Sequence, residues 1–192
     1  MKKITTKITD ANEGMHDPRA YKGAKEMLEN HDYEQARLYH LRLTDSNQVE
    51  PYLAAIKALV AHLRKNNIRC QYKAAVEEDD GQGIHMHVFL LVEAKLNNPC
   101  HIINRKADGW LAIMLLKRGL DFSLNSPRSA MHYGKDQAQK NYASVPKTKG
   151  AKIADCVLWI SYLYKNRSKP DLEQIYYSSR PTRERLENRS GE

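Results

Sequence analysis

The sequence predicts an α+β domain in which a central antiparallel β-sheet is flanked by helices. Residues 36–44 alternate apolar and polar side chains, which is the period of a half-buried strand. Residues 68–94 contain two further extended runs joined by the turn sequence DDGQG, which is typical of a β-hairpin. Two segments, 51–65 and 151–165, have apolar residues at intervals of three and four, as amphipathic helices do.

Length and composition indicate one domain that does not enter a membrane. The chain has 192 residues and a mean hydropathy of -0.71. We expect neither a membrane span nor a secretory signal, because no run of about 20 apolar residues is present and no apolar segment follows the N-terminal lysines. Cys70, Cys100 and Cys156 are odd in number and form no C-x-x-C pair, which predicts free thiols. We therefore expect a cytoplasmic location.

The first half of the chain begins with a polar segment and then alternates helical and extended segments. We expect a flexible N-terminal arm over 1–18, a short helix over 19–31 and the strand over 36–44. The next helix begins near Pro51, because proline is favoured in a first helical turn, and it ends at Asn66.

The second half of the chain starts with the hairpin and is less regular afterwards. Its expected elements are strands over 68–78 and 84–94, helices over 103–119 and 151–165, and an edge strand over 173–179. Residues 121–150 show no clear period. The folded domain is expected to span 19–180, and the charged residues 181–192 are expected to form a disordered tail.

The distribution of charge indicates a polyanionic partner. The chain holds 31 basic and 23 acidic residues, a formal net charge of +8. The first 100 residues hold 14 of each sign, so the remaining 92 hold 17 basic and 9 acidic residues and carry the whole excess. Such an asymmetry favours nucleic-acid binding, although mild basicity is also compatible with a purely solubilising role.

His85 and His87 are the sharpest candidates for chemistry. Side chains at i and i+2 of a strand share one face, so the two imidazoles project side by side while Met86 points to the opposite, core-packed face. Two neutral imidazoles can bind one divalent cation, and Mg²⁺ or Mn²⁺ also needs an anionic ligand. Glu77 or Glu78 can supply it, depending on the hairpin register; we favour Glu77, with Glu78 second. The plain alternative is a histidine pair without a ligand, because 8 histidines make a His-x-His sequence common by chance.

A second motif, SYLYK at 161–165, lies in the predicted late helix. Tyr162 and Lys165 are three residues apart and share one helix face, with Arg167 and Lys169 just beyond. A tyrosine can attack a phosphodiester once its proton is lost, and a nearby cation can stabilise the developing charge. Tyr162 alone is more simply explained as a packing residue, but a metal site upstream makes catalysis by Tyr162 and Lys165 the better hypothesis. Tyr164 is rotated by about 200° around the helix and is a poor second nucleophile.

Together these motifs resemble the HUH endonucleases. The strand LYHLRLT, the hairpin end IHMHVFLLVE and the later YLYK are similar to single-tyrosine rolling-circle replication initiators of filamentous phages and prophages, the inovirus and YfjJ-like group. Further features that match this group are Glu77 eight positions before the histidine pair, GWLAIML around Trp110, Asn125-Ser126-Pro127 and Ser179-Arg180. The resemblance covers about residues 36–181, and Met86 and Tyr164 depart from its pattern.

The resemblance implies a palm-like sheet of HUH/RRM type and a site-specific nickase of single-stranded or hairpin origin DNA. It implies Mg²⁺ or Mn²⁺ bound by His85, His87 and Glu77, with Tyr162 attacking the scissile phosphate. A 5′-phosphotyrosine and a free 3′-OH would result, which would initiate rolling-circle replication of a phage, prophage or plasmid and would permit rejoining.

The same resemblance suggests which residues contact DNA and which partners act with the protein. The expected DNA-contacting residues are polar or basic: His40, Arg42, Thr44, Lys135, Lys140, Lys147, Lys149, Lys152, Arg167 and Lys169. Tyr133 and Tyr142 either stack on bases or anchor a loop. The sequence contains no G-x-x-x-x-G-K-[ST] motif, so we expect a host helicase and polymerase to unwind and extend the DNA.

Three alternatives remain open at the level of sequence. The basic half can belong to a non-catalytic DNA-binding domain in which the histidines are structural. The metal site can belong to a phosphodiesterase that uses water and forms no covalent adduct. Within the HUH class, a small transposase or a relaxase would use the same chemistry on a different DNA substrate.

Overall fold

The structure is a computed structural model, which describes residues 17–79, 83–94, 97–104, 106–125, 141–147, 150–164 and 169–179. The α-helices are α2 (Pro18–Glu29), α3 (Val49–Lys65), α4 (Trp110–Leu116) and α5 (Ala151–Ile160), and two 3₁₀ turns cover Pro99–His101 (η1) and Ser161–Tyr164 (η4). The strands are β1 (Ala36–Thr44), β2 (Cys70–Asp79), β3 (Gly83–Glu93), β4 (Asp121–Asn125), β5 (Tyr142–Val145) and β6 (Tyr176–Ser178).

One antiparallel sheet contains all six strands of the described residues. Five of them run in the order β4-β1-β3-β2-β6, and β5 also pairs with β1. The predicted strand at 36–44, the hairpin and the late edge strand are all present. The predicted α+β class is therefore confirmed.

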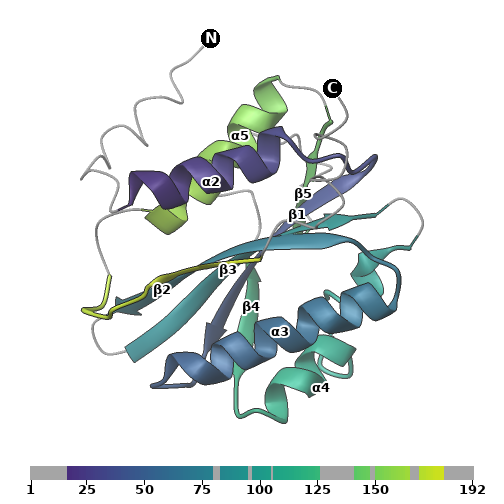
Figure 1. The fold of residues 1–192 in the computed structure, drawn as a ribbon. Helices are drawn as coiled ribbons and strands as arrows, with labels where there is room; N and C mark the ends of the chain where they lie inside the picture. The colour runs from purple at the N-terminus through teal and green to yellow at the C-terminus, as the bar shows by residue number, and fades with distance from the viewer. Residues whose placement is uncertain are drawn as a thin grey trace, which may run out of the picture.

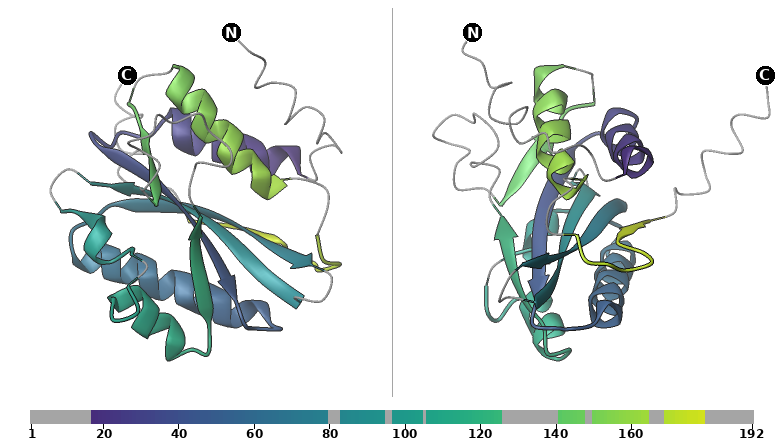
Figure 2. Two further views of the ribbon diagram at one scale, coloured as in Figure 1. Left: turned by 180° about the vertical axis from the view of Figure 1, so that it is seen from behind. Right: turned by 90° about the vertical axis from the view of Figure 1, so that its left-hand side faces the viewer.

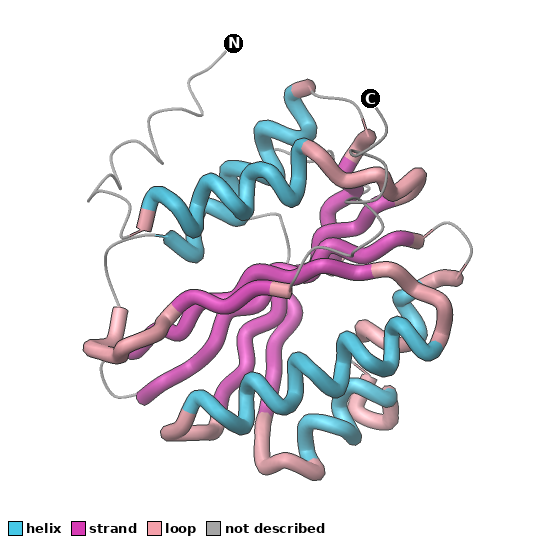
Figure 3. The backbone as a smooth tube through the Cα atoms, viewed as in Figure 1, coloured by secondary structure: helices cyan, strands magenta, loops and turns pink. Residues whose placement is uncertain are grey.

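The sheet lies between two layers of helices. Helices α2 and α5 cover one face, and α3 and α4 cover the other (Figure 1). The side view in Figure 2 and the tube in Figure 3 show the same arrangement, with strands between helices on both sides. Burial on both faces explains why the central strand β3 is buried along nearly its whole length.

Each helical layer encloses its own apolar core. Beneath α3 and α4, alternate residues of the central strand such as Met86, Val88 and Leu90 pack against the buried stripe of α3. Beneath α2 and α5, Phe89 and Leu91 of the same strand pack against those two helices. Because side chains alternate along a strand, successive residues of β3 belong to the two different cores.

Helix α2 begins where the local sequence provides a cap. The carboxylate of Asp17 accepts hydrogen bonds from the backbone N–H groups of Arg19 (2.8 Å) and Ala20 (3.0 Å), and Pro18 occupies the first helical position. Helix α3 begins at Val49, two residues before Pro51, and ends at Lys65 with Asn66 as its C-cap. It is followed by Asn67 in the left-handed conformation, at φ 55°.

The helix predicted over 103–119 is much shorter, and this part of the prediction is wrong. Helix α4 starts only at Trp110, after Gly109. The side chain of Asn104 bonds to the carbonyls of Cys100 and His101 and to the backbone N–H of Lys106. These local bonds replace the helical bonds that the apolar spacing predicted, because an asparagine side chain competes with the backbone for hydrogen bonds.

Two short strands lie in the segment 121–150, for which the sequence predicted no element. Strand β4 pairs with the second half of β1, and β5 pairs with the first half. With five and four residues, they are too short to show a clear period.

The predicted helix at 151–165 also ends early. Helix α5 stops at Ile160, and residues 161–164 continue as the 3₁₀ turn η4.

Two further observations concern the predicted environment of the protein. Cys70, Cys100 and Cys156 are free thiols. Among the described helices, none is long and apolar enough to cross a bilayer. The predicted arm at 1–18 lies almost entirely, and the tail at 181–192 entirely, outside the described residues.

Candidate metal centre

The hairpin register brings three potential metal ligands together. Glu77 of β2 lies directly opposite His85 of β3, and His87 follows two residues later on the same face. One ligand atom of each residue lies within 4.8 Å of the other two, and all three residues are buried. Glu78 is exposed and pairs with Ile84, so the structure favours Glu77 as the carboxylate of the group.

The donor atoms of this group fit a divalent cation. Oε2 of Glu77 lies 3.3 Å from Nε2 of His87 and 3.8 Å from Nε2 of His85. Two imidazole nitrogens and one carboxylate oxygen are common ligands of divalent metals. Nδ1 of His85 is buried and has no hydrogen-bond partner among the described residues. The Glu77–His85–His87 group could therefore bind a metal ion.

His40 supports this group from β1. Its Nε2 lies 2.8 Å from Nδ1 of His87, and its ring stacks on Phe89 at a centroid distance of 4.2 Å. A hydrogen bond on one ring nitrogen determines which nitrogen is left to bind a metal, so His40 orients His87. His40 was predicted to contact DNA, but it is only 4% exposed, which does not agree with that role. The alternation of apolar and polar residues over 36–44 placed His40 on the polar face of its strand. It could not show that Trp159 of α5 covers that face.

The electrostatic environment favours the protonation states of Glu77 and His87 that metal binding requires. Burial lowers the pKa of His40 well below its ordinary value, and the neighbouring His87 lowers it further. Burial also lowers the pKa of His87, which the carboxylate of Glu77 opposes only in part. Burial alone would raise the pKa of Glu77, but its contacts with the two histidines and the charge of Lys169 hold it well below the usual range. Neutral imidazoles beside an ionised carboxylate are the forms that bind metal ions.

Lys169 forms a buried ion pair with the candidate ligand Glu77. Its Nζ lies 2.7 Å from Oε1 of Glu77, and its side chain is only 3% exposed. The ammonium group also lies 5.6 Å from the ring centroid of Tyr176. Lys169 was predicted to contact DNA, and its burial does not agree with that role. No local signal marks this pairing, because the two residues are 92 positions apart in the sequence.

Arg42 and Asp79 form an ion pair at the more exposed side of the group. Nη2 of Arg42 lies 3.4 Å from Oδ2 of Asp79, and the same oxygen lies 3.6 Å from Nε2 of His85. The side chains are 26% and 43% exposed, respectively. Arg42 thus lies within reach of a molecule that approaches the candidate centre. Thr44, two residues on, is half-buried on the same face of β1.

Tyr162 lies next to the histidines. It belongs to η4, is half-buried, and its ring centroid lies 5.4 Å from that of His87 and 6.3 Å from that of His40. Tyr164 instead packs into a tyrosine cluster, against Tyr176 at 5.2 Å. Burial raises the pKa of Tyr164, which makes its phenol a poor nucleophile.

The structure describes only some of the predicted basic residues. Lys135, Lys140, Lys149, Lys165 and Arg167 lie outside the described residues, as does Tyr133. Lys147 and Lys152 are described and exposed. The guanidinium of Arg37 lies over the ring of Tyr142, with Cζ of Arg37 4.5 Å from the ring centroid. Tyr142 therefore packs against another part of the protein.

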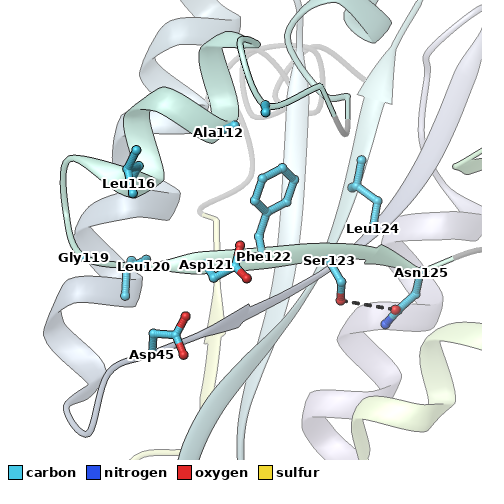
Figure 4. A pocket seen from close by; sticks show the side chains of 11 residues that line it. Asp45, Ala112, Leu116, Gly119, Leu120, Asp121, Phe122, Ser123, Leu124 and Asn125 are labelled. Carbon is cyan, nitrogen blue, oxygen red and sulfur yellow. Dashed lines mark hydrogen bonds between the residues drawn. The ribbon is translucent and has the colours of Figure 1, made fainter.

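An open pocket of about 850 Å³ lies away from the histidines, between α4 and β4 (Figure 4). Its lining includes the apolar residues Leu116, Leu120 and Phe122. One of its lining residues, Asn125, reaches His40, with its side-chain amide 3.4 Å from Nδ1 of His40. The pocket therefore does not coincide with the residues that can perform chemistry.

Comparisons with known proteins do not assign this fold and site to a family: no family model matches the chain, and neither curated proteins nor solved structures give a significant match.

Proposed function

We propose that this protein is a metal-dependent endonuclease that cleaves and rejoins single-stranded DNA through a 5′-phosphotyrosine intermediate. The observation that carries the proposal is the position of Tyr162, whose ring lies 5.4 Å from His87 of the Glu77–His85–His87 group. A phenol beside a potential metal site is the minimal arrangement for nucleophilic attack on a phosphodiester.

In this proposal, His85, His87 and Glu77 hold Mg²⁺ or Mn²⁺. When bound, the ion would act as a Lewis acid on the scissile phosphate. His40 holds the ring of His87 in place through its 2.8 Å hydrogen bond. Lys169 pairs with Oε1 of Glu77 at 2.7 Å, which leaves Oε2 as the ligand atom.

The covalent step would be carried out by Tyr162. Its phenolic oxygen forms a bond to phosphorus while the bond from phosphorus to the 3′-oxygen breaks. The phenol loses a proton and the departing 3′-oxygen gains one, so that the charge balances. Since the phosphotyrosine ester replaces a phosphodiester, the same site can return the strand to a 3′-OH without an external energy source.

The charge of the protein supports a nucleic-acid substrate. The excess of basic residues lies entirely in residues 101–192, which contain Tyr162, and Arg42 lies partly exposed beside the metal-binding group. We propose origin DNA, single-stranded or hairpin, as the substrate, and initiation of rolling-circle replication of a phage, prophage or plasmid as the role. A host helicase and polymerase would then act on the nicked DNA. A transposase or relaxase role would use the same residues on another substrate.

A cleavage assay with a matched tyrosine control tests the proposal. Wild type, Tyr162→Phe and Tyr177→Phe are incubated with Mn²⁺ and labelled single-stranded and hairpin oligonucleotides, and denaturing gels are examined for protein bound covalently to DNA. Tyr177 is a suitable control because it packs against the opposite core of the sheet. We expect an adduct with wild type and Tyr177→Phe and none with Tyr162→Phe.

Other outcomes would replace the proposal with a specific alternative. An adduct that persists in Tyr162→Phe would identify another nucleophile. Cleavage without any adduct would indicate a phosphodiesterase that uses water. Binding of the oligonucleotides without cleavage would indicate a non-catalytic DNA-binding domain.

A further inference from the structure

Asp79 is a second carboxylate close to the candidate metal centre. It lies two residues after Glu77 on β2, so the two side chains share one face of the sheet. Its Oδ2 lies 3.6 Å from Nε2 of His85, slightly nearer than Oε2 of Glu77 at 3.8 Å. Asp79 is therefore positioned on the side of His85 that is more open to solvent.

The distance between Asp79 and His85 is close to one within a metal coordination shell, but the compact group in which all ligand atoms lie within 4.8 Å of one another contains only Glu77, His85 and His87. Donor atoms that bind one octahedral ion at right angles to each other lie about 3 Å apart, given bonds of about 2.1 Å. To join the shell, the Asp79 carboxylate has to move closer to His85 and rotate inward towards Glu77 and His87. The residue is at the end of its strand and 43% exposed, which leaves room for such a movement.

The charge of the centre also favours a second carboxylate. Glu77 supplies one negative charge, but the buried ammonium of Lys169 offsets it at 2.7 Å. Because imidazoles bind metal ions in their neutral form, the metal-binding group without Asp79 would supply no net charge to an ion. Hard divalent cations such as Mn²⁺ and Mg²⁺ bind preferentially to anionic oxygen ligands, so a further carboxylate would strengthen their binding at this centre.

We infer that Asp79 is a fourth protein ligand of this metal centre. On metal binding, Asp79 would leave Arg42 for the ion, and a phosphate of the substrate would take its place beside Arg42. The inference rests on the proposed function. The oxygen that would bind the ion is the same Oδ2 that lies 3.4 Å from Nη2 of Arg42. Its transfer to the ion therefore weakens the ion pair.

Arg42 is well placed to use the contact that is released. It lies directly opposite His87 in the register of β1 and β3, on the face that carries the metal ligands. A guanidinium group binds phosphate oxygens through two parallel hydrogen bonds. The exchange would couple the two events, because the metal-loaded protein would bind DNA more tightly than the metal-free protein.

Titration calorimetry with MnCl₂ tests the role of Asp79 without any catalytic readout. We expect Asp79→Asn to bind Mn²⁺ about tenfold or more weakly than wild type. Glu78→Gln removes the same charge from the adjacent exposed residue and should bind within about twofold of wild type. Circular dichroism spectra of both variants check that they are folded.

The result separates this inference from the proposed function. Equal Mn²⁺ affinity of Asp79→Asn and wild type would overturn the role of Asp79 and leave the three-ligand centre intact. Failure of wild type to bind Mn²⁺ would overturn both.

The role of Arg42 is tested in the Tyr162→Phe background, which prevents cleavage. The affinity for a labelled oligo-dT strand is measured by fluorescence anisotropy in MnCl₂ and in chelator. We expect Mn²⁺ to raise the affinity several-fold, and this gain to be largely lost in Tyr162→Phe/Arg42→Gln. If Arg42→Gln weakens binding by the same factor with and without Mn²⁺, the exchange does not occur.

Discussion

The two faces of the sheet bury different kinds of side chain, although the same strands supply both. On the face beneath α3 and α4, the central strand contributes Met86, Val88 and Leu90 to an apolar core. On the face beneath α2 and α5, it contributes Phe89 and Leu91 at one end and His85 and His87 at the other. The second face thus changes from apolar to polar along a single strand.

This difference indicates where stability and chemistry reside. Apolar burial stabilises the first face without requiring partners. The polar end of the second face has to compensate for the desolvation of an ionised carboxylate and several imidazoles, and it does so through pairing with Lys169 and His40. Substitutions on the first face should therefore change stability alone, whereas those at the polar end should change stability and metal binding together.

The largest expected effect lies on the apolar face. Leu90→Ala removes a fully buried side chain and should lower the free energy of unfolding by about 3 to 4 kcal/mol. Its Mn²⁺ affinity should stay within about twofold of wild type, because Leu90 points away from the histidines. Urea denaturation and calorimetry measure the two quantities.

Leu116→Ala is the matched control for this prediction. Leu116 lies on α4, on the same side of the sheet, but is 77% exposed, so its substitution should cost less than about 0.5 kcal/mol. A large loss of Mn²⁺ affinity in Leu90→Ala would show that the two faces are coupled.

The next effect concerns the buried ion pair. In chelator, Lys169→Met should lower the free energy of unfolding by about 2 to 3 kcal/mol, because Glu77 must then be protonated or remain as an unpaired buried charge. Mn²⁺ affinity should rise by about tenfold, since a positive charge no longer opposes the ion. Lys169→Met should therefore lower the stability of the metal-free protein while raising its affinity for Mn²⁺.

Lys73→Met is the control, because Lys73 is a half-buried lysine on the same face of β2 whose neighbouring charge is Glu26 of α2. Its Mn²⁺ affinity should match that of wild type. If Lys169→Met binds Mn²⁺ more weakly than wild type, Lys169 acts mainly by holding Glu77 in position.

The smallest effect is a pH dependence at the polar end. The pKa of His40 is lowered by burial, so below its ordinary pKa of about 6.5 the unfolded chain binds a proton that the folded chain does not. The free energy of unfolding should therefore decrease as pH falls, by about 1.4 kcal/mol between pH 7.5 and 5.5 for this residue alone. In His40→Leu, this contribution to the pH dependence of the free energy of unfolding should disappear. Urea denaturation across this pH range in chelator measures it, and parallel slopes for wild type and His40→Leu would contradict the prediction.

Much of this architecture follows from short-range patterns in the sequence. The alternation over 36–44, the helical spacing after Pro51 and the turn between two extended runs each predicted an element that the structure contains. The same period of two placed His85 and His87 on one face. The hairpin also limited the carboxylate to Glu77 or Glu78, because a hairpin turn returns the chain beside itself.

The short elements could not be predicted in this way. Helix α4 begins seven residues later than its spacing indicated, because the side chain of Asn104 competes for backbone hydrogen bonds. Strands β4 and β5 form where β1 offers a free edge, and such pairing depends on a distant strand more than on local sequence.

The sequence alone therefore determined the class of the fold and the face on which the histidines lie, since both depend on periodicity within a few residues. The tertiary structure decided what covers that face. It buried His40 under α5, brought Lys169 to Glu77 across 92 positions of sequence, and placed Asp79 between Arg42 and His85. The physical reason is that a period specifies the direction of a side chain relative to its own strand, whereas burial and ion pairing depend on which distant segments pack against it.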